Sequence, residues 1–266
     1  MRIFVTGGGG MLGQDVVRAA GDGVMALSHA DLDVTDAGAV REALEGADLV
    51  INCAAWTDVD GAEEHPQAAL AVNRDGARNV AEAAERVLYV SSDYVFDGAK
   101  RAPYVESDPT APLQSYGRSK LAGELVTAQA NPRHFIVRSS WLFGAGGGNF
   151  VETMLRLGRE RGELRVVDDQ VGCPTFTGHL AEAIVALART EDYGIHHLAG
   201  TGKSSWYQFA REIFERSGVD CHVEPCTTDE YPRPARRPAW SVLGSERGRS
   251  LPPWQEGLDA YLGVRA

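Results

Sequence analysis

The sequence has 266 residues, of which 26 are basic and 37 acidic, so its formal net charge is −11. This acidic balance argues against bulk nucleic-acid binding, because such binding needs a basic face that displaces counterions. It is compatible with one small anionic ligand held by a few local arginines. An apolar share of 44% is ample for a sizeable core, and the length suits one large α/β domain with a small additional lobe.

The sequence pattern contains neither a membrane span nor an export signal. No stretch approaches the roughly 18 consecutive apolar residues of a membrane helix, and the run from Ile3 to Val5 is too short for a signal-peptide core. Cys221, His222 and Cys226 form one metal-like cluster without a matching second half, which favours ordinary reduced thiols over zinc. We therefore expect a cytoplasmic protein that contacts no membrane.

Short apolar runs alternate with helical stretches from the first residues onward. Strands are predicted at residues 2–6, 24–27, 48–53, 87–91, 134–138 and 194–198. Helices are predicted at residues 12–20, 37–44, 67–85, 116–130 and 179–188. Because these strands are apolar throughout rather than half polar, they predict a Rossmann-like α/β fold with a doubly wound parallel sheet.

The alternation of strands and helices changes after Gly144. A flexible loop is expected at residues 144–148, helices at 150–158 and 205–217, and a segment rich in proline and arginine at 231–238. We therefore predict a dinucleotide-binding domain and a small, mainly C-terminal substrate-binding lobe over the carboxyl ends of the strands. The predicted domain comprises residues 1–143 plus 176–199, and the predicted lobe comprises residues 144–175 plus 200–266.

Four consecutive glycines follow the first predicted strand, and a fifth opens the first predicted helix. Gly8, Gly10 and Gly13 match the spacing G-x-G-x-x-G, and Gly7, Gly10 and Gly13 match the variant G-x-x-G-x-x-G. Glycine lets the backbone approach a pyrophosphate, and the helix N-terminus then offers free N–H groups and a positive dipole end. The arrangement predicts dinucleotide binding.

The end of the second predicted strand bears on the choice of cofactor. Ser28 and His29 stand where NAD-binding proteins usually have a carboxylate, and Asp31 and Asp33 come a few residues later. A carboxylate would repel a 2′-phosphate, whereas serine and histidine tolerate it, so NADPH is favoured and NADH stays open. For Asp33, a place near the adenine and a role in capping the next helix are both open.

Tyr116 and Lys120 lie four residues apart at the start of a predicted helix, which places them on one helical face. A lysine ammonium beside a phenol is expected to lower the phenol pKa toward neutrality, so that Tyr116 can exchange a proton with a carbonyl or alcohol oxygen. This spacing also occurs on ordinary exposed helix faces. Ser92 strengthens the catalytic interpretation, because it ends the fourth strand at the edge where such folds bind ligands.

The glycine loop, Ser92 and Tyr116-x-x-x-Lys120 together resemble the extended short-chain dehydrogenase/reductase family. The similarity is greater to its branch of reductases that act on dTDP-4-keto-6-deoxy sugars. Supporting strings run in order along nearly the whole chain: LDVTD at 32–36, NCAAWTDVD at 52–60, VN at 72–73, SDYVFDG at 92–98, YGRSKLAGE at 116–124, NF at 149–150, VDDQVGCPT at 167–175 and PARRP at 234–238.

The resemblance implies NAD(P)H-dependent reduction of the C4 keto group of dTDP-4-dehydro-L-rhamnose to give dTDP-L-rhamnose. It implies cofactor contacts to the pyrophosphate from Gly10, Met11 and Leu12, to the adenine from Asp33 and Val34, and to the nicotinamide from Ala54, Ala55 and Trp56. It implies that the sugar is held by Ser92, Asp93 and Trp141. Tyr116 would then be the proton donor, and Lys120 would bind the nicotinamide ribose.

The chain departs from the family pattern at a few positions. Ser92 stands where the family usually has threonine, and Trp240 and Gly244 replace an expected asparagine and aspartate. These changes leave two alternatives open besides the implied reaction. One is a reductase of another dTDP-4-keto-6-deoxy sugar in a deoxysugar or antibiotic pathway. The other is a non-enzymatic NADP-binding regulatory subunit, like that of methionine adenosyltransferase.

Two further residues, Asn149 and Arg236, have two interpretations each, and the question of a metal is open. Asn149 is a candidate substrate contact or a helix cap. Arg236, with its neighbouring arginines among prolines, is a candidate contact for the diphosphate of a nucleotide sugar or part of a solvated basic turn. Some relatives bind Mg²⁺ at a dimer contact through glutamates, but those ligands have no clear counterpart here, so we predict no metal site and leave Mg²⁺ and a homodimer open.

Overall fold

Six strands of the computed structural model, which describes residues 1–265, form one parallel sheet in the order β2-β1-β3-β4-β5-β10. Their bounds are β1 Ile3–Thr6, β2 Met25–Leu27, β3 Leu49–Asn52, β4 Val87–Ser92, β5 His134–Ser139 and β10 Gly194–His197. The chain runs outward from β1 to β2 and then crosses back to β3, so the strand order reverses between β1 and β3. Open α/β sheets bind ligands beyond the carboxyl ends of their strands at such a point.

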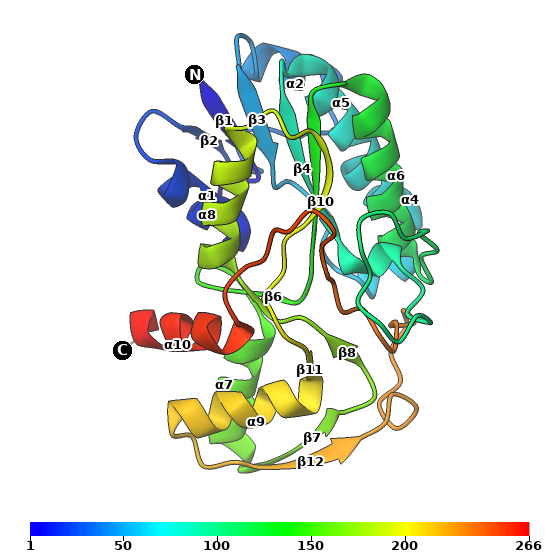
Figure 1. Cartoon of the computed structure of the whole chain (residues 1–266), viewed down its shortest axis with the longest axis vertical. Helices are drawn as coiled ribbons and strands as arrows, with labels where there is room; N and C mark the ends of the chain where they lie inside the picture. Colours follow the sequence, from blue (N-terminus) through cyan, green and yellow to red (C-terminus); the bar gives the residue numbers. More distant parts are fainter. Residues whose placement is uncertain (266) are drawn as a thin grey trace.

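Helices cover both faces of this sheet (Figure 1). Ile3 and Val5 of β1 pack into a cluster with α1 (Met11–Ala20) and α8 (Thr177–Ala188), whereas Phe4 packs into a second cluster with α2 (Ala37–Ala43) and α5 (Ala77–Ala83). On the side of α5 also lies α6 (Ser115–Ala130), which packs against α5 and β4. Because both faces of the sheet are covered, β1 and β3 are buried along their whole length, and the predicted doubly wound α/β fold is confirmed.

The helix predicted at residues 67–85 is wrong in its middle. The structure has α4 (Pro66–Leu70), then a π-helical segment (Ala71–Gly76) and then α5. Such widened turns often occur at functional sites, where they reorient a side chain. The predicted helix at 150–158 is extended in α7 (Phe150–Arg161), which ends at Gly162 with a left-handed backbone (φ 68°).

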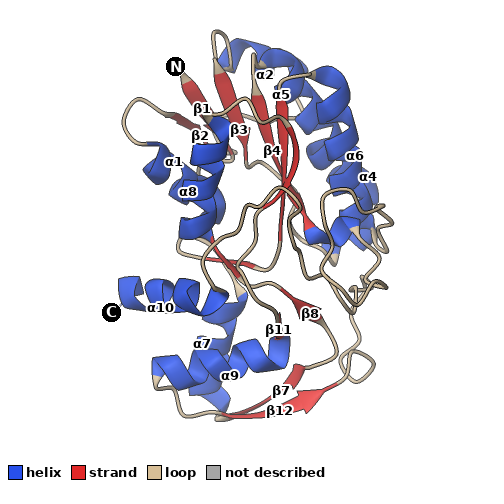
Figure 2. Ribbon diagram, viewed as in Figure 1, coloured by secondary structure: helices blue, strands red, loops and turns tan. Residues whose placement is uncertain are grey.

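A smaller part of the molecule lies beyond the carboxyl ends of the strands (Figure 2). Its core cluster joins α7 to α9 (Trp206–Ser217) and α10 (Trp254–Arg265). Two parallel strands, β7 (Glu163–Val167) and β12 (His222–Cys226), complete it. The sequence patterns predicted α9 but not α10, β7 or β12. The division of the chain into a dinucleotide-binding domain and a substrate-binding lobe stays a prediction.

Short elements connect the two parts. Two strand pairs lie there, β6 (Leu142–Phe143) with β9 (Thr175–Phe176), and β8 (Val171–Gly172) with β11 (Ser204–Ser205). A short helix, α3 (Gly61–Glu64), follows β3 and contacts α4 and α6. Among residues 1–265, no helix has the length and apolar character needed to cross a membrane.

Candidate active site

The glycine loop after β1 is shaped for close backbone packing. Gly7 has a left-handed backbone (φ 68°), and a Cβ there would lie 2.6 Å from the backbone nitrogen of Ala54. A Cβ on Gly13 would overlap the carbonyl oxygen of Gly7. Gly10 precedes α1 without any side-chain cap, so the amides that open the helix at Met11 and beyond are left for another acceptor. These features fit a dinucleotide pyrophosphate at the switch point.

The segment after β2 carries a carboxylate close to the predicted adenosine end. Asp31 accepts hydrogen bonds from the backbone nitrogen (2.8 Å) and the hydroxyl (2.6 Å) of Ser28, and these bonds lower the pKa of the Asp31 carboxyl. Asp33 accepts from Thr35, whereas Asp36 caps α2. The capping alternative for Asp33 is therefore wrong, because the cap belongs to the residue that directly precedes the helix.

Asn73 joins three elements around the predicted nicotinamide side. It is fully buried in the π-helical segment, and its side chain accepts from the backbone nitrogen of Trp56 (2.9 Å) and donates to the Trp56 carbonyl (3.1 Å). It also donates to the hydroxyl of Ser119 (2.8 Å), the residue before Lys120. Asn73 thus holds the segment of Ala54, Ala55 and Trp56 against α6. In the sequence, Asn73 stands out only as part of the VN string, and no sequence pattern indicates this role.

Ser92, Tyr116 and Lys120 meet at the carboxyl end of β4. The Ser92 side chain lies close enough to the Tyr116 hydroxyl to influence its pKa. One helical turn later, the Lys120 ammonium donates to the Val90 carbonyl (2.7 Å) and lies 4.3 Å from the centre of the Tyr89 ring. The structure therefore brings together the three residues that the sequence analysis named as catalytic.

Burial controls the ionisation of both helix residues. It raises the pKa of Tyr116 to about 12, although the Ser92 side chain opposes the change. Burial also lowers the pKa of Lys120 to about 7, and the Glu124 carboxylate opposes that change. The expectation of a Tyr116 pKa near neutrality is wrong for this structure, because desolvation outweighs the effect of Ser92. A phenol with so high a pKa is protonated at neutral pH, as a proton donor must be.

Asp93 extends the site toward the C-terminal segment. One of its carboxylate oxygens accepts a hydrogen bond from the Ser92 hydroxyl (3.0 Å), and the Ser241 side chain lies beside the same carboxyl group. Burial raises the pKa of Asp93 to about 7, and the interactions with Ser241 and Ser92 oppose this change. Ser241 is a site residue that the sequence patterns did not indicate, because it is 148 positions from Asp93 in a segment without regular structure.

The remaining predicted substrate residues differ in their surroundings. Trp141 lies two residues after Ser139, which pairs with Ser92 across β5 and β4, so Trp141 is at the same edge of the sheet. Asn149 accepts from the backbone of Glu152 at the start of α7 and donates to the Gly144 carbonyl. These bonds support its capping alternative. Arg236 is exposed and makes no hydrogen bond or ion pair within residues 1–265.

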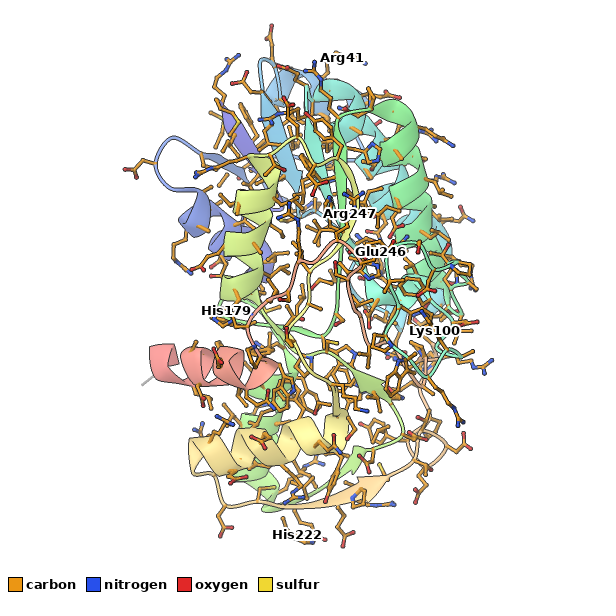
Figure 3. All side chains as sticks on the ribbon, in the orientation of Figure 1. Arg41, Lys100, His179, His222, Glu246 and Arg247 are labelled. Carbon is orange, nitrogen blue, oxygen red and sulfur yellow. The ribbon has the colours of Figure 1, made fainter. Side chains whose placement is uncertain are left out.

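Metal-binding groups do not gather in the described part of the chain. Within residues 1–265, no three or more His, Cys, Asp or Glu side chains are close enough together to hold a metal ion. His222, from the metal-like sequence cluster, lies at the end of the molecule farthest from the sheet (Figure 3).

The parallel sheet, the glycine loop and the Ser92–Tyr116–Lys120 set define the class of short-chain dehydrogenases and reductases. The chain belongs to the family described as RmlD substrate binding domain, whose pattern matches residues 1–265. It is 43% identical over 280 aligned positions to a dTDP-4-dehydrorhamnose reductase of Mycolicibacterium smegmatis. The alignment covers 99% of this chain and 86% of the relative.

Two further comparisons bear on ligand and substrate. A crystal structure of dTDP-4-dehydrorhamnose reductase from Bacillus anthracis in complex with NADP matches with a TM-score of 0.94 and 37% identity, covering 100% of this chain and 99% of that one. A probable dTDP-4,6-dihydroxy-2-methyloxan-3-one 4-ketoreductase of Streptomyces antibioticus is 42% identical, covering 97% of this chain and 93% of the relative.

Proposed function

We propose that the protein reduces the C4 keto group of dTDP-4-dehydro-L-rhamnose to give dTDP-L-rhamnose, with NADPH as the preferred reductant and NADH as an alternative. The observation that carries the proposal is the grouping of Ser92, Tyr116 and Lys120 at the carboxyl end of β4, in a chain of this family. The Mycolicibacterium relative and the NADP complex of the Bacillus relative support the same substrate and cofactor.

The cofactor would be held along the switch point between β1 and β3. The amides around Gly7, Gly10, Met11, Leu12 and Gly13 would bind the pyrophosphate, because they surround the uncapped start of α1. The adenosine end would lie near Ser28, Asp33 and Val34, and the nicotinamide near Ala54, Ala55 and Trp56. Lys120 would bind the nicotinamide ribose.

In the proposed reaction, the hydroxyls of Ser92 and Tyr116 bind the C4 carbonyl oxygen of the sugar. Bound NADPH supplies the hydride that adds to the carbonyl carbon. Tyr116 donates its proton to the oxygen as negative charge develops there, so that C=O becomes CH–OH. Lys120, one turn further along α6, stabilises the phenolate that Tyr116 becomes. Asp93 and Trp141 would contact the sugar, Arg236 the diphosphate, and Asn149 is retained as a contact next to its capping role.

A second substrate is supported by a specific observation. The Streptomyces antibioticus relative, a probable 4-ketoreductase of a different dTDP sugar, is nearly as similar to this chain as the Mycolicibacterium relative. The alternative substrate is therefore another dTDP-4-keto-6-deoxy sugar. A non-enzymatic binding subunit has no such support, because Ser92, Tyr116 and Lys120 are all present and adjacent.

The test follows NADPH oxidation at the nicotinamide absorbance, with dTDP-4-dehydro-L-rhamnose and with a second dTDP-4-keto-6-deoxy sugar as substrates. We expect turnover of the first, and a loss of about a hundredfold or more in kcat for Tyr116→Phe with cofactor binding retained. Tyr207→Phe, the same change on α9, is the matched control and should leave kcat unaltered. Turnover of the second sugar alone would select the alternative, and NADPH binding without any turnover would contradict both.

One finer expectation accompanies this proposal, a cytoplasmic location. The oligomeric state is left open, and sedimentation velocity of the purified protein over the micromolar range distinguishes a homodimer from a monomer.

A further inference from the structure

Trp141 has an unusual backbone conformation for a bulky residue. Its φ is 47°, and Arg101 is the other non-glycine residue with a positive φ among residues 1–265. Side chains with a Cβ rarely adopt this region, because the Cβ comes too close to the backbone. Such a conformation persists where neighbouring contacts hold it, and it often occurs at functional sites. The backbone conformation of Trp141 is therefore expected to depend on the contacts of its side chain.

Trp206, the first residue of α9, stacks directly on the Trp141 indole. The two ring centres are 3.5 Å apart and the ring planes differ by 4°. Phe150 packs against Trp206, and the centres of these two rings are 4.6 Å apart. A Cβ on Gly172 would lie 2.5 Å from Cε2 of Trp141, so glycine at this position leaves room for the indole.

Trp206 is itself held by residues of the VDDQVGCPT string. Its indole nitrogen donates to the side-chain oxygen of Gln170 (3.2 Å), and Gln170 donates to Thr228 (3.0 Å). The Ser205 hydroxyl caps α9 in a capping box and also hydrogen-bonds to Asp168. This string therefore fixes the start of α9, and with it the plane of the Trp206 ring.

The stacked pair lies where the substrate of the proposed reaction would bind. Trp141 follows β5, and Ser139 at the end of β5 pairs with Ser92. Both indoles are half-buried, so the Trp141 ring retains surface that is not covered by Trp206. A flat aromatic surface favours the apolar face and methyl group of a 6-deoxy sugar, provided that the ring is held in one orientation.

We propose that Trp206 is a positioning residue that holds the Trp141 indole as a rigid wall for the deoxysugar ring of the nucleotide sugar. The inference rests on the proposed function, because it concerns binding of that substrate. Trp206 contacts Trp141 and would act on the sugar only through it. Trp206 should therefore affect the affinity for the substrate rather than the rate of the chemical step. Loss of the stack should therefore raise KM for the sugar nucleotide and leave KM for NADPH unchanged.

The stack itself has a spectroscopic signature. Two indoles packed face to face couple their excited states, so the wild-type protein should give a split tryptophan band in far-ultraviolet circular dichroism. Trp206→Leu and Trp141→Phe should both remove the split band. Tyr207→Leu, which removes the neighbouring aromatic side chain of the same helix, should retain it. A wild-type spectrum without a split band would overturn the proposed stack.

Steady-state kinetics test the role of the stack. For Trp206→Leu we expect KM for the sugar nucleotide to rise about tenfold or more, with kcat within about threefold of wild type. Trp206→Phe keeps a flat ring and should recover part of the affinity, whereas Tyr207→Leu should leave both constants unaltered. Thermal unfolding of each variant identifies any that fail to fold, and the conservative Trp206→Phe then carries the test.

The two proposals fail in different ways. Suppose that the wild-type enzyme is active and that the folded Trp206→Phe and Trp206→Leu variants both have the wild-type KM for the sugar nucleotide. This result would overturn the positioning role alone. A fall in kcat without a change in KM would also overturn it. If none of the dTDP-4-keto sugars supports NADPH oxidation by the wild-type protein, the proposed function is overturned. The role of Trp206 in sugar binding is then overturned with it.

Discussion

Glu124 and Arg138 form a two-point ion pair between α6 and β5, and each side chain is only 3% exposed. The Arg138 guanidinium donates to both carboxylate oxygens, at 2.9 and 2.7 Å, and the Ser91 hydroxyl donates to one of them at 2.5 Å. The pair thereby fixes α6, which carries Tyr116 and Lys120, to β5, and the bond from Ser91 fixes the same helix to β4, which carries Ser92. It is a structural connection between the two halves of the proposed catalytic set.

Glu124→Gln should lower the free energy of unfolding by about 3–5 kcal/mol, because the buried Arg138 charge loses its partner. Urea denaturation of the purified protein measures this. Glu85→Gln is the matched control, since Glu85 pairs with Arg133 at the surface with exposures of 59% and 55%. That change should cost less than about 1 kcal/mol. Equal losses in the two variants would contradict a structural role for the buried pair.

Arg237 connects the C-terminal segment to the segment that follows β3. Its guanidinium hydrogen-bonds to both carboxylate oxygens of Asp60, and four residues later Ser241 lies beside Asp93. Arg237→Gln should therefore raise KM for the sugar nucleotide about tenfold through displacement of Ser241. Arg233→Gln is the control, because Arg233 is 53% exposed and lies 3.5 Å from the same carboxylate. A KM equal to that of wild type in Arg237→Gln would contradict this coupling.

Asp93 should make stability fall as the pH rises. Its ordinary pKa is 3.8 and its folded pKa is about 7, so between these values the folded protein binds more protons than the unfolded one. Asp93→Asn cannot ionise, and its gain in unfolding free energy over wild type should grow between about pH 5 and about pH 8. Urea denaturation at the two pH values measures the difference.

Asp97→Asn provides the control for this pH dependence. The pKa of Asp97 is lowered, chiefly by a hydrogen bond from the Ala99 backbone, so its carboxylate is ionised in both folded and unfolded protein at either pH. The effect of Asp97→Asn on stability should therefore be the same at both. A gain for Asp93→Asn that does not change with pH would contradict a raised pKa.

The carboxylate of Asp31 should weaken discrimination in favour of NADPH. It hydrogen-bonds to Ser28 at the end of β2, near the place proposed for the adenosine ribose, and its lowered pKa keeps it charged at neutral pH. Asp31→Asn should lower KM for NADPH a few-fold relative to KM for NADH, and the effect should shrink at high salt. Asp36→Asn removes the same charge at the cap of α2 and should leave the ratio unaltered. An unchanged ratio in Asp31→Asn would place the 2′-phosphate elsewhere.

Features that depend on neighbours along the chain follow from the sequence alone. The apolar run Leu49–Asn52 predicted a buried parallel strand, because a strand covered on both faces has no polar side. The glycines from Gly7 to Gly13 predicted the tight turn between β1 and α1, where the pyrophosphate is proposed to bind. The four-residue spacing of Tyr116 and Lys120 placed both on one helical face, since helix geometry fixes which residues are adjacent. The spacing did not predict the ionisation of these groups.

Contacts between distant segments, in contrast, follow only from the packing of the whole chain. Asp60 meets Arg237 across 177 positions, and Trp141 meets Trp206 across segments whose order in space no local pattern specifies. The pKa of Tyr116 was likewise decided by packing, because desolvation depends on what surrounds the phenol rather than on its spacing from Lys120. Local geometry is set by the backbone of a few residues, whereas burial and long-range contacts arise only when the whole chain packs together.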